Sequence, residues 1–148
     1  MAVTEILLHN FNATVVALSR TTTNELRALH RKFNSNSLSI NTEPENRSLQ
    51  IIECDVSNED RLCQAISETD KKYGRIDGLI LNAGVIDPMG RIDSLDNNID
   101  SWKALFDVNF FSLVSALKAA IPALRKSKPG RVIFVSSGAA EGGTAAWG

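Results

Sequence analysis

Polar residues follow the apolar runs of this chain, at positions where their side chains could bind a ligand. Arg20 follows ATVVALS, Asp55 follows SLQIIEC, Asn82, Ala83 and Gly84 follow DGLIL, and the pair Ser136–Ser137 follows RVIFV. A guanidinium group binds phosphate through paired hydrogen bonds, and a serine hydroxyl can stabilise a developing alkoxide. Glycine lets the backbone come close to a ligand because it has no β-carbon. These residue types suit phosphate binding and hydrogen bonding to a substrate oxygen.

Asn109 is a further candidate, because it is a polar residue between Val108 and the pair Phe110–Phe111. We expect the segment around it to be a mostly buried helix, where an amide needs hydrogen-bond partners. A functional role and a structural one, capping or bending the helix, both remain open. His9 and His30 have no matched acid or nucleophile, so we predict neither to be a catalytic base.

Alternating helices and strands are expected to position these residues. Continuous apolar runs predict strands at 13–19, 48–54, 77–82 and 131–137. Polar segments at 35–47 and 87–98 predict surface loops. Strands that are apolar along their whole length and separated by helices imply a parallel sheet covered on both faces. The pattern therefore predicts a doubly wound α/β fold of the Rossmann type, in one partial domain spanning residues 1–148.

Helix boundaries follow from capping residues and apolar spacing. The expected first helix has Val3, Ile6 and Leu7 on its apolar face. Thr22 and Glu25 form a capping box before the second helix, and Ser57 caps the third, which ends at Gly74. The predicted buried residues of these two helices are Leu26, Leu29, Phe33, Leu62, Ala65 and Ile66. A long helix is expected from Ser101 to Lys126, kinked or ended by Pro122, with an apolar stripe of Trp102, Leu105, Phe106, Phe110, Val114 and Leu117.

Composition excludes several classes of function. With 16 basic and 17 acidic side chains and a net charge of −1, we expect neither nucleic acid nor a membrane surface as a partner. No apolar stretch approaches the roughly 20 residues that span a bilayer. Cys54 and Cys63 are too few and too far apart for a disulfide framework or a zinc site. We therefore expect no metal, no signal peptide and a cytoplasmic location.

Four motifs resemble the short-chain dehydrogenase/reductase family: CDVS, LILNAGV, FDVNFFS and VIFVSSGAA. Each occurs on the expected element and in the family's order. Within the family, FDVNFFS and VIFVSSGAA look most similar to fungal benzil reductases, and sepiapterin reductase is a more distant likeness. The resemblance implies an NADPH-dependent reductase of ketones or diketones that works as a homodimer, pairing through the long helix.

The resemblance also implies roles for the candidate residues. Arg20 would accommodate the 2′-phosphate of NADP, Asp55 would accept from the adenine amino group, and Val56 would lie beside the adenine ring. Asn82, Ala83 and Gly84 would support the cofactor and brace the sheet. Asn109 would help to hold a proton-relay water, and Ser137, or Ser136 if the alignment slips by one, would bind the substrate carbonyl.

A structural alternative stays open for each of these residues. Arg20 could be a solvated strand-end arginine, and Asp55 a turn or cap acid. The Asn82–Gly84 segment could be an ordinary strand-to-loop turn, and the serine pair a turn former.

Two motifs of the family have no counterpart in the sequence. No glycine-rich phosphate loop precedes MAVTEILL, and the Tyr-x-x-x-Lys pair is expected just beyond Gly148; Tyr73 is the single tyrosine, and no lysine follows it at the required spacing. We therefore expect a chain that lacks the first strand and the C-terminal part of the fold, and that is prone to aggregate on its own. The alternative functions are a non-catalytic remnant that binds a partner and a dinucleotide sensor.

Overall fold

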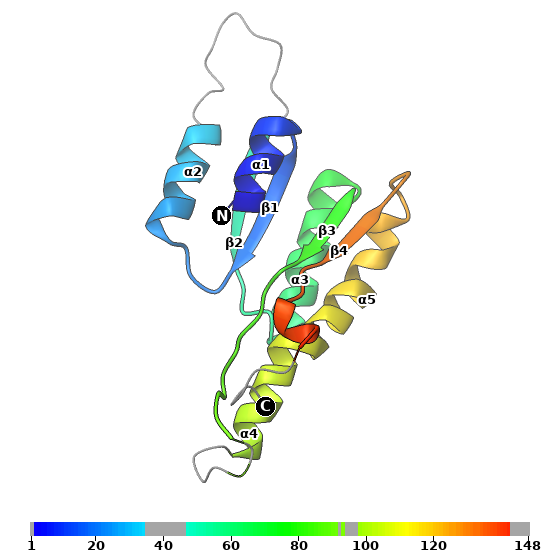
Figure 1. The fold of residues 1–148 in the computed structure, drawn as a ribbon. Coiled ribbons are helices and arrows are strands. Elements are labelled where there is room, and N and C mark those ends of the chain that lie inside the picture. Colours follow the sequence, from blue (N-terminus) through cyan, green and yellow to red (C-terminus); the bar gives the residue numbers. More distant parts are fainter. Residues whose placement is uncertain (1, 35–46, 92, 94–97, 143–148) are drawn as a thin grey trace, which may run out of the picture. The chain divides into compact units, whose positions relative to one another are not determined.

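The computed structural model describes residues 2–34, 47–91, 93 and 98–142. Its elements, in chain order, are α1 (Ala2–Asn10), β1 (Thr14–Ser19), α2 (Asn24–Asn34), β2 (Ser48–Glu53), α3 (Glu59–Tyr73), β3 (Gly78–Leu81), α4 (Ile99–Phe106), the π-helix η2 (Asp107–Phe111), α5 (Ser112–Leu124), β4 (Arg131–Phe134) and the 3₁₀ turn η3 (Gly138–Ala140) (Figure 1). Most of the loop predicted at 35–47, and part of the one predicted at 87–98, lie outside the described residues. The alternation of helices and parallel strands is that of the predicted α/β fold class.

The chain separates into two compact units, Met1–Asp55 and Val56–Gly148. In the first unit β1 and β2 pair in parallel, with Val15 opposite Leu49 and Ala17 opposite Ile51. These four residues lie on one face of the sheet, and α1 and α2 pack on that face. The core there consists of Leu8, Leu26, Leu29, Phe33 and Leu49.

The second unit pairs β3 with β4 in parallel and packs α3 against α5. The contact between the helices is built from small residues of α5, since Ala116, Ala120 and Ala123 are buried. Beyond the end of α5, Lys126 Nζ lies 2.8 Å from both carboxylate oxygens of Asp70 on α3. The single domain predicted from the sequence stays a prediction.

Two capping predictions were wrong by one residue. The hydroxyl of Thr23, not Thr22, accepts from the N–H of Leu26 at the start of α2, because Thr22 instead donates to the carboxylate of Glu53. At α3 the cap is Asn58, not Ser57, since the Asn58 side chain accepts from the N–H of Arg61 at 3.0 Å. The predicted C-terminal glycine is confirmed, because Gly74 takes the left-handed conformation with φ 79°.

The predicted apolar faces of two helices were also wrong. In α1 the buried residue is Leu8, whereas Val3 and Ile6 are exposed. The long helix begins at Ile99 and ends at Leu124, two residues beyond Pro122, and its predicted stripe leaves Phe106, Phe110 and Val114 exposed. The run Ile99–Leu124 covers 26 residues and is long and apolar enough to cross a membrane by length and composition alone, a test that core helices of soluble proteins also pass.

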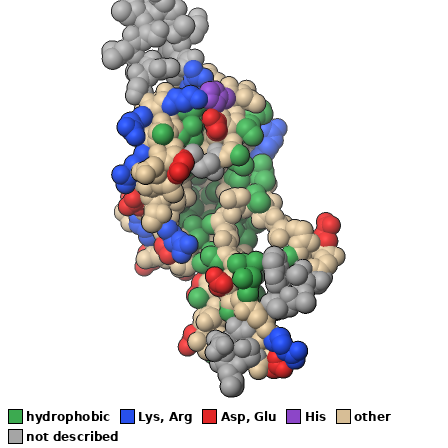
Figure 2. All heavy atoms as spheres, turned by 60° about the vertical axis from the view of Figure 1, so that its left-hand side comes forward, with side chains coloured by type: hydrophobic (Ala, Val, Ile, Leu, Met, Phe, Trp, Pro, Cys, Tyr) green, Lys and Arg blue, Asp and Glu red, His purple; other side chains and the backbone are tan. Residues whose placement is uncertain are grey.

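Strand β4 departs from the expectation that both faces of every strand are covered. Val132, Ile133, Phe134 and the following Val135 are all exposed. Within the described residues β4 is paired on one edge only, with β3. Apolar side chains therefore reach the surface at several places (Figure 2).

Candidate active site

Arg20 and Asp55 emerge next to each other in the Met1–Asp55 unit. Parallel strands end at the same edge of a sheet, and the N–H of Cys54 donates to the carbonyl of Ser19 at 2.9 Å. Arg20 follows Ser19 and Asp55 follows Cys54, so these two residues leave the sheet at the same edge. Both side chains are exposed, and no carboxylate pairs with Arg20 in the part of the chain that the structure describes. A guanidinium group in this position could donate hydrogen bonds to a phosphate group.

The second unit has an equivalent edge, where β3 and β4 end. The N–H of Val135 donates to the carbonyl of Leu81 at 2.9 Å. Asn82 and Ser136 follow these two residues, so they lie at the same edge of the sheet. Ser137 follows as the cap of η3, and its hydroxyl oxygen accepts from the N–H of Ala139 at 3.3 Å. That contact uses an acceptor lone pair, so the hydroxyl proton of Ser137 stays available for donation.

Asn109 lies in the π-helix η2 and bonds to the loop after β3. Its Oδ1 accepts from the N–H of Val85 at 2.8 Å, and its Nδ2 donates to the carbonyl of the same residue at 2.7 Å. A carboxamide can serve both groups at once, whereas a carboxylate has no donor. The side chain is half-buried, and its partners are now identified as backbone groups. The predicted role of Asn109 in holding a water stays a prediction.

The π-helix itself is local evidence for a specialised position. Single π turns within α-helices are rare and occur often at functional sites. One carbonyl of this turn, that of Val108, accepts from the buried hydroxyl of Ser112 at 2.6 Å. The side chain of Ser112 thus satisfies a backbone acceptor in the widened turn.

Gly84 lies directly beside Asn109. A β-carbon built on Gly84 would come 3.5 Å from Asn109 Oδ1, which is ordinary van der Waals contact. Gly84 is exposed, and its φ is not in the left-handed region. The described fold therefore does not itself require glycine at this position, which leaves close approach of a ligand as a reason for it.

Val56 follows Asp55 and is the first residue of the second unit. It is half-buried and lines a cavity of about 280 Å³ in the second unit, together with Ser57, Glu59, Asp107, Phe111, Ser112, Val114 and Ser115. The structure thus forms three local groups: Arg20 with Asp55, Asn82–Gly84 with Asn109, and Ser137 beyond the end of β4. The functional roles predicted for these residues are not tested by their positions alone.

Sequence reasoning missed Val85, which supplies both partners of Asn109. A backbone partner leaves no signal in residue type, so no pattern could have identified it. Among the described residues there is no group of three or more histidine, cysteine, aspartate and glutamate side chains that could hold a metal ion.

Comparison with known proteins gives the family. The short chain dehydrogenase family matches residues 7–148. An oxidoreductase of Schizosaccharomyces pombe is 49% identical over 83 residues, which are 56% of this chain and 32% of that protein. An (S)-benzoin-forming benzil reductase of Saccharomyces cerevisiae is 40% identical over 89 residues, 57% of this chain and 34% of that protein.

The solved structures agree with this result. The crystal structure of the KRED1-Pglu enzyme matches 98% of this chain and 54% of its own length, with a TM-score of 0.76 and 34% identity. The chain thus spans about a third of these two curated relatives and about half of this solved structure. On the match over residues 7–148, the chain belongs to the short-chain dehydrogenase family of oxidoreductases, which use NAD or NADP.

Proposed function

We propose that the intact protein is an NADPH-dependent carbonyl reductase acting on ketones or vicinal diketones. The observation that carries the proposal is Ser137, whose hydroxyl is held by the Ala139 N–H at the carboxyl end of β4 with its proton free to donate. Donation to a carbonyl oxygen would stabilise the charge that develops there during reduction. The 40% identity to a benzil reductase supports an aromatic diketone as substrate.

NADP is the proposed cofactor, and it would supply the hydride. Arg20 supports this choice because a basic residue at the end of this strand suits a 2′-phosphate, whereas an acid suits a ribose hydroxyl. Its side chain is exposed at the strand edge, beside Asp55. Asp55 would accept from the adenine amino group, and the exposed backbone at Gly84 would pass close to the cofactor.

We further propose that the protein is a homodimer that pairs along Ile99–Leu124. Phe106, Phe110, Phe111 and Val114 are each about half exposed there, at 49%, 52%, 55% and 50%. Burial of such side chains stabilises association by roughly 25 cal/mol for each Å² removed from water. Both cysteines are free thiols, which is consistent with the proposed cytoplasmic location.

Turnover by the intact natural protein tests the proposed reaction. NADPH oxidation would be followed at 340 nm with benzil, and NADH would be the cofactor control. Ser137→Ala should lower kcat by about 100-fold or more, the usual loss for one oxyanion donor, whereas Ser136→Ala should change it by less than about threefold. Equal loss in both variants, or no reduction of any diketone by the wild type, would refute the assignment.

A further inference from the structure

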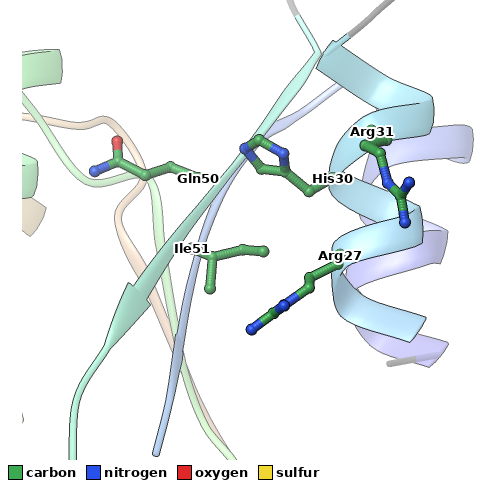
Figure 3. A pocket seen from close by; sticks show the side chains of 5 residues that line it. All are labelled: Arg27, His30, Arg31, Gln50 and Ile51. Atoms are coloured by element: carbon green, nitrogen blue, oxygen red, sulfur yellow. The ribbon is translucent and has the colours of Figure 1, made fainter. Parts of the chain in front are cut away.

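A cavity of about 550 Å³ opens between α2 and β2, within the Met1–Asp55 unit. Arg27, His30 and Arg31 line it from α2, and Gln50 and Ile51 line it from β2 (Figure 3). Figure 3 shows Arg27 and His30 extending from the helix towards the strand. The cavity is largely open to solvent, and its volume lies within the roughly 300–1,000 Å³ of small-molecule sites.

The charge of this cavity is one-sided. Arg27 and Arg31 are four residues apart on one helix face, where like charges repel, and none of the described residues that line the cavity is acidic. Neither guanidinium pairs with a carboxylate among the described residues, whereas Lys32 on the same helix lies 4.0 Å from Glu5. The cavity therefore presents two unneutralised cations.

His30 adds a ring N–H donor, which follows from the orientation of the Asn34 amide. Asn34 Oδ1 accepts from the N–H of Leu49 at 3.1 Å, and Asn34 Nδ2 donates to the Leu49 carbonyl at 2.9 Å. These two bonds fix the orientation of the amide, so the remaining Nδ2 proton points to His30 Nε2, 2.8 Å away. Nε2 must then be the acceptor, and the ring proton resides on Nδ1.

The outer edge of β2 adds a backbone donor. Backbone groups of alternate strand residues point to the same side. The N–H of Cys54 points to β1, where it donates to Ser19, while that of Leu49 points away from β1 to Asn34. Ile51 lies two residues after Leu49 on the same strand, so its N–H also points away from β1. Within the described residues β2 pairs only with β1, so no strand covers this edge.

We propose that this cavity binds a small organic anion, a carboxylate or a phosphate monoester whose apolar part contacts Ile51. The guanidinium group of Arg27, the Nδ1–H of His30 and the N–H of Ile51 would surround the anion, and Arg31, which lies along the helix (Figure 3), would add a second positive charge. The site is separate from the proposed cofactor site. Ile51 pairs with Ala17 in mid-strand, two residues before the strand end from which Arg20 emerges.

Titration of the ¹⁵N-labelled intact protein with phenyl phosphate, benzoate and inorganic phosphate tests the proposal. We expect saturable shifts of the Ile51 amide and the His30 ring with at least one organic anion. The double variant Arg27→Gln/Arg31→Gln should weaken that binding tenfold or more. The control Lys71→Gln/Lys128→Gln removes the same charge from exposed sites and should change the affinity by less than about twofold.

Three outcomes would overturn the proposal. The first is the absence of saturation up to about 10 mM of each organic anion. The second is equal weakening by the two double variants, which would show unspecific attraction of anions to the protein. The third is displacement of the anion by NADP⁺, which would assign these residues to the cofactor site. Preference for phenyl phosphate or for benzoate identifies which of the two anions the site takes.

Discussion

The carboxamide of Asn109 satisfies both backbone polar groups of Val85, accepting at 2.8 Å and donating at 2.7 Å. This pair of bonds connects the π-helix η2 to the loop that follows β3, 24 residues earlier in the sequence. A side chain held at both ends has one rotamer, so the loop and the helix position one another.

Replacing Asn109 should destabilise the second unit. Asn109→Ala leaves the N–H and the carbonyl of Val85 without this partner. Asn109→Asp keeps the acceptor but places a carboxylate oxygen against the Val85 carbonyl oxygen, where the two repel. Each variant should lower the free energy of unfolding by about 1–3 kcal/mol, measured by urea denaturation. Val85→Ala is the matched control, because it retains both backbone groups. Equal stability of Asn109→Asp and wild type would contradict the two-ended contact.

Gly84→Ala should separate cofactor binding from folding. The added methyl group meets only Asn109 Oδ1, at ordinary contact distance, so the melting temperature should stay within a few degrees of wild type. If the cofactor passes over this backbone, its Kd should rise tenfold or more, which is about 1.4 kcal/mol or more. Calorimetric titration with NADP⁺ measures this change. A large fall in melting temperature would mean that glycine is needed by the fold itself.

Gly130→Ala should be among the most destabilising small substitutions in the second unit. A β-carbon there would overlap the carbonyl oxygen of Leu124, a backbone atom that cannot turn away. We expect a loss of about 1–3 kcal/mol from overpacking, measured by thermal unfolding. Gly78→Ala is the control, since a β-carbon at that site meets nothing within 4 Å. Similar losses for the two variants would disprove the steric explanation.

Asn34→Ala should expose the outer edge of β2. The wild-type carboxamide occupies the N–H and the carbonyl of Leu49, much as a neighbouring strand would. Its loss should cost about 1–2 kcal/mol and should speed aggregation, because open edges pair with other chains. Light scattering at constant temperature follows the aggregation. Asn34→Asp keeps the acceptor but places a carboxylate oxygen against the Leu49 carbonyl oxygen, so it should also destabilise the edge; an unfolding free energy equal to that of wild type for either variant would count against this account.

Asp77 should make a small contribution to the free energy of unfolding that is lost in acid. The hydroxyl of Ser127, and then Arg75, hold the pKa of Asp77 below its ordinary value. A carboxyl with a depressed folded-state pKa contributes stability above its unfolded-state pKa, about 3.9, and loses it as the pH falls through the folded-state value. The difference in unfolding free energy between wild type and Asp77→Asn should therefore be constant near neutrality and shrink below about pH 4. A difference that grows on acidification would reverse the assignment.

The order of elements was predictable from the sequence, because apolar runs and helical spacing depend on local periodicity. Both errors in helix caps arose where two candidate side chains are adjacent: Thr22 has a competing partner in Glu53, and Asn58 follows Ser57. The buried face of α5 was misjudged for another reason. Its alanines pack closely on α3, while the large residues that dominate a hydrophobic pattern stay exposed.

Of the candidate site, the residues at strand ends could be predicted, because parallel strands of any sequence end at one edge. The contact between Asn109 and Val85 could not, because its partner is backbone and its geometry depends on a π turn. Residue pattern alone did not distinguish Ser136 from Ser137. The structure records a hydrogen bond to the Ser137 hydroxyl from Ala139, which is information about conformation and not about composition.

The π-helix between α4 and α5 absorbs one extra residue without changing the rotational phase of the helix that follows it. Each residue of an α-helix advances the face by about 100°, and a π turn accommodates one residue more than an α turn does. Removing one residue from Asp107–Phe111 would thus convert the π turn to an α turn, which would withdraw Asn109 from Val85 but leave Ala116, Ala120 and Ala123 facing α3. The extra residue therefore serves the candidate site without disturbing the packing of the helix that follows it.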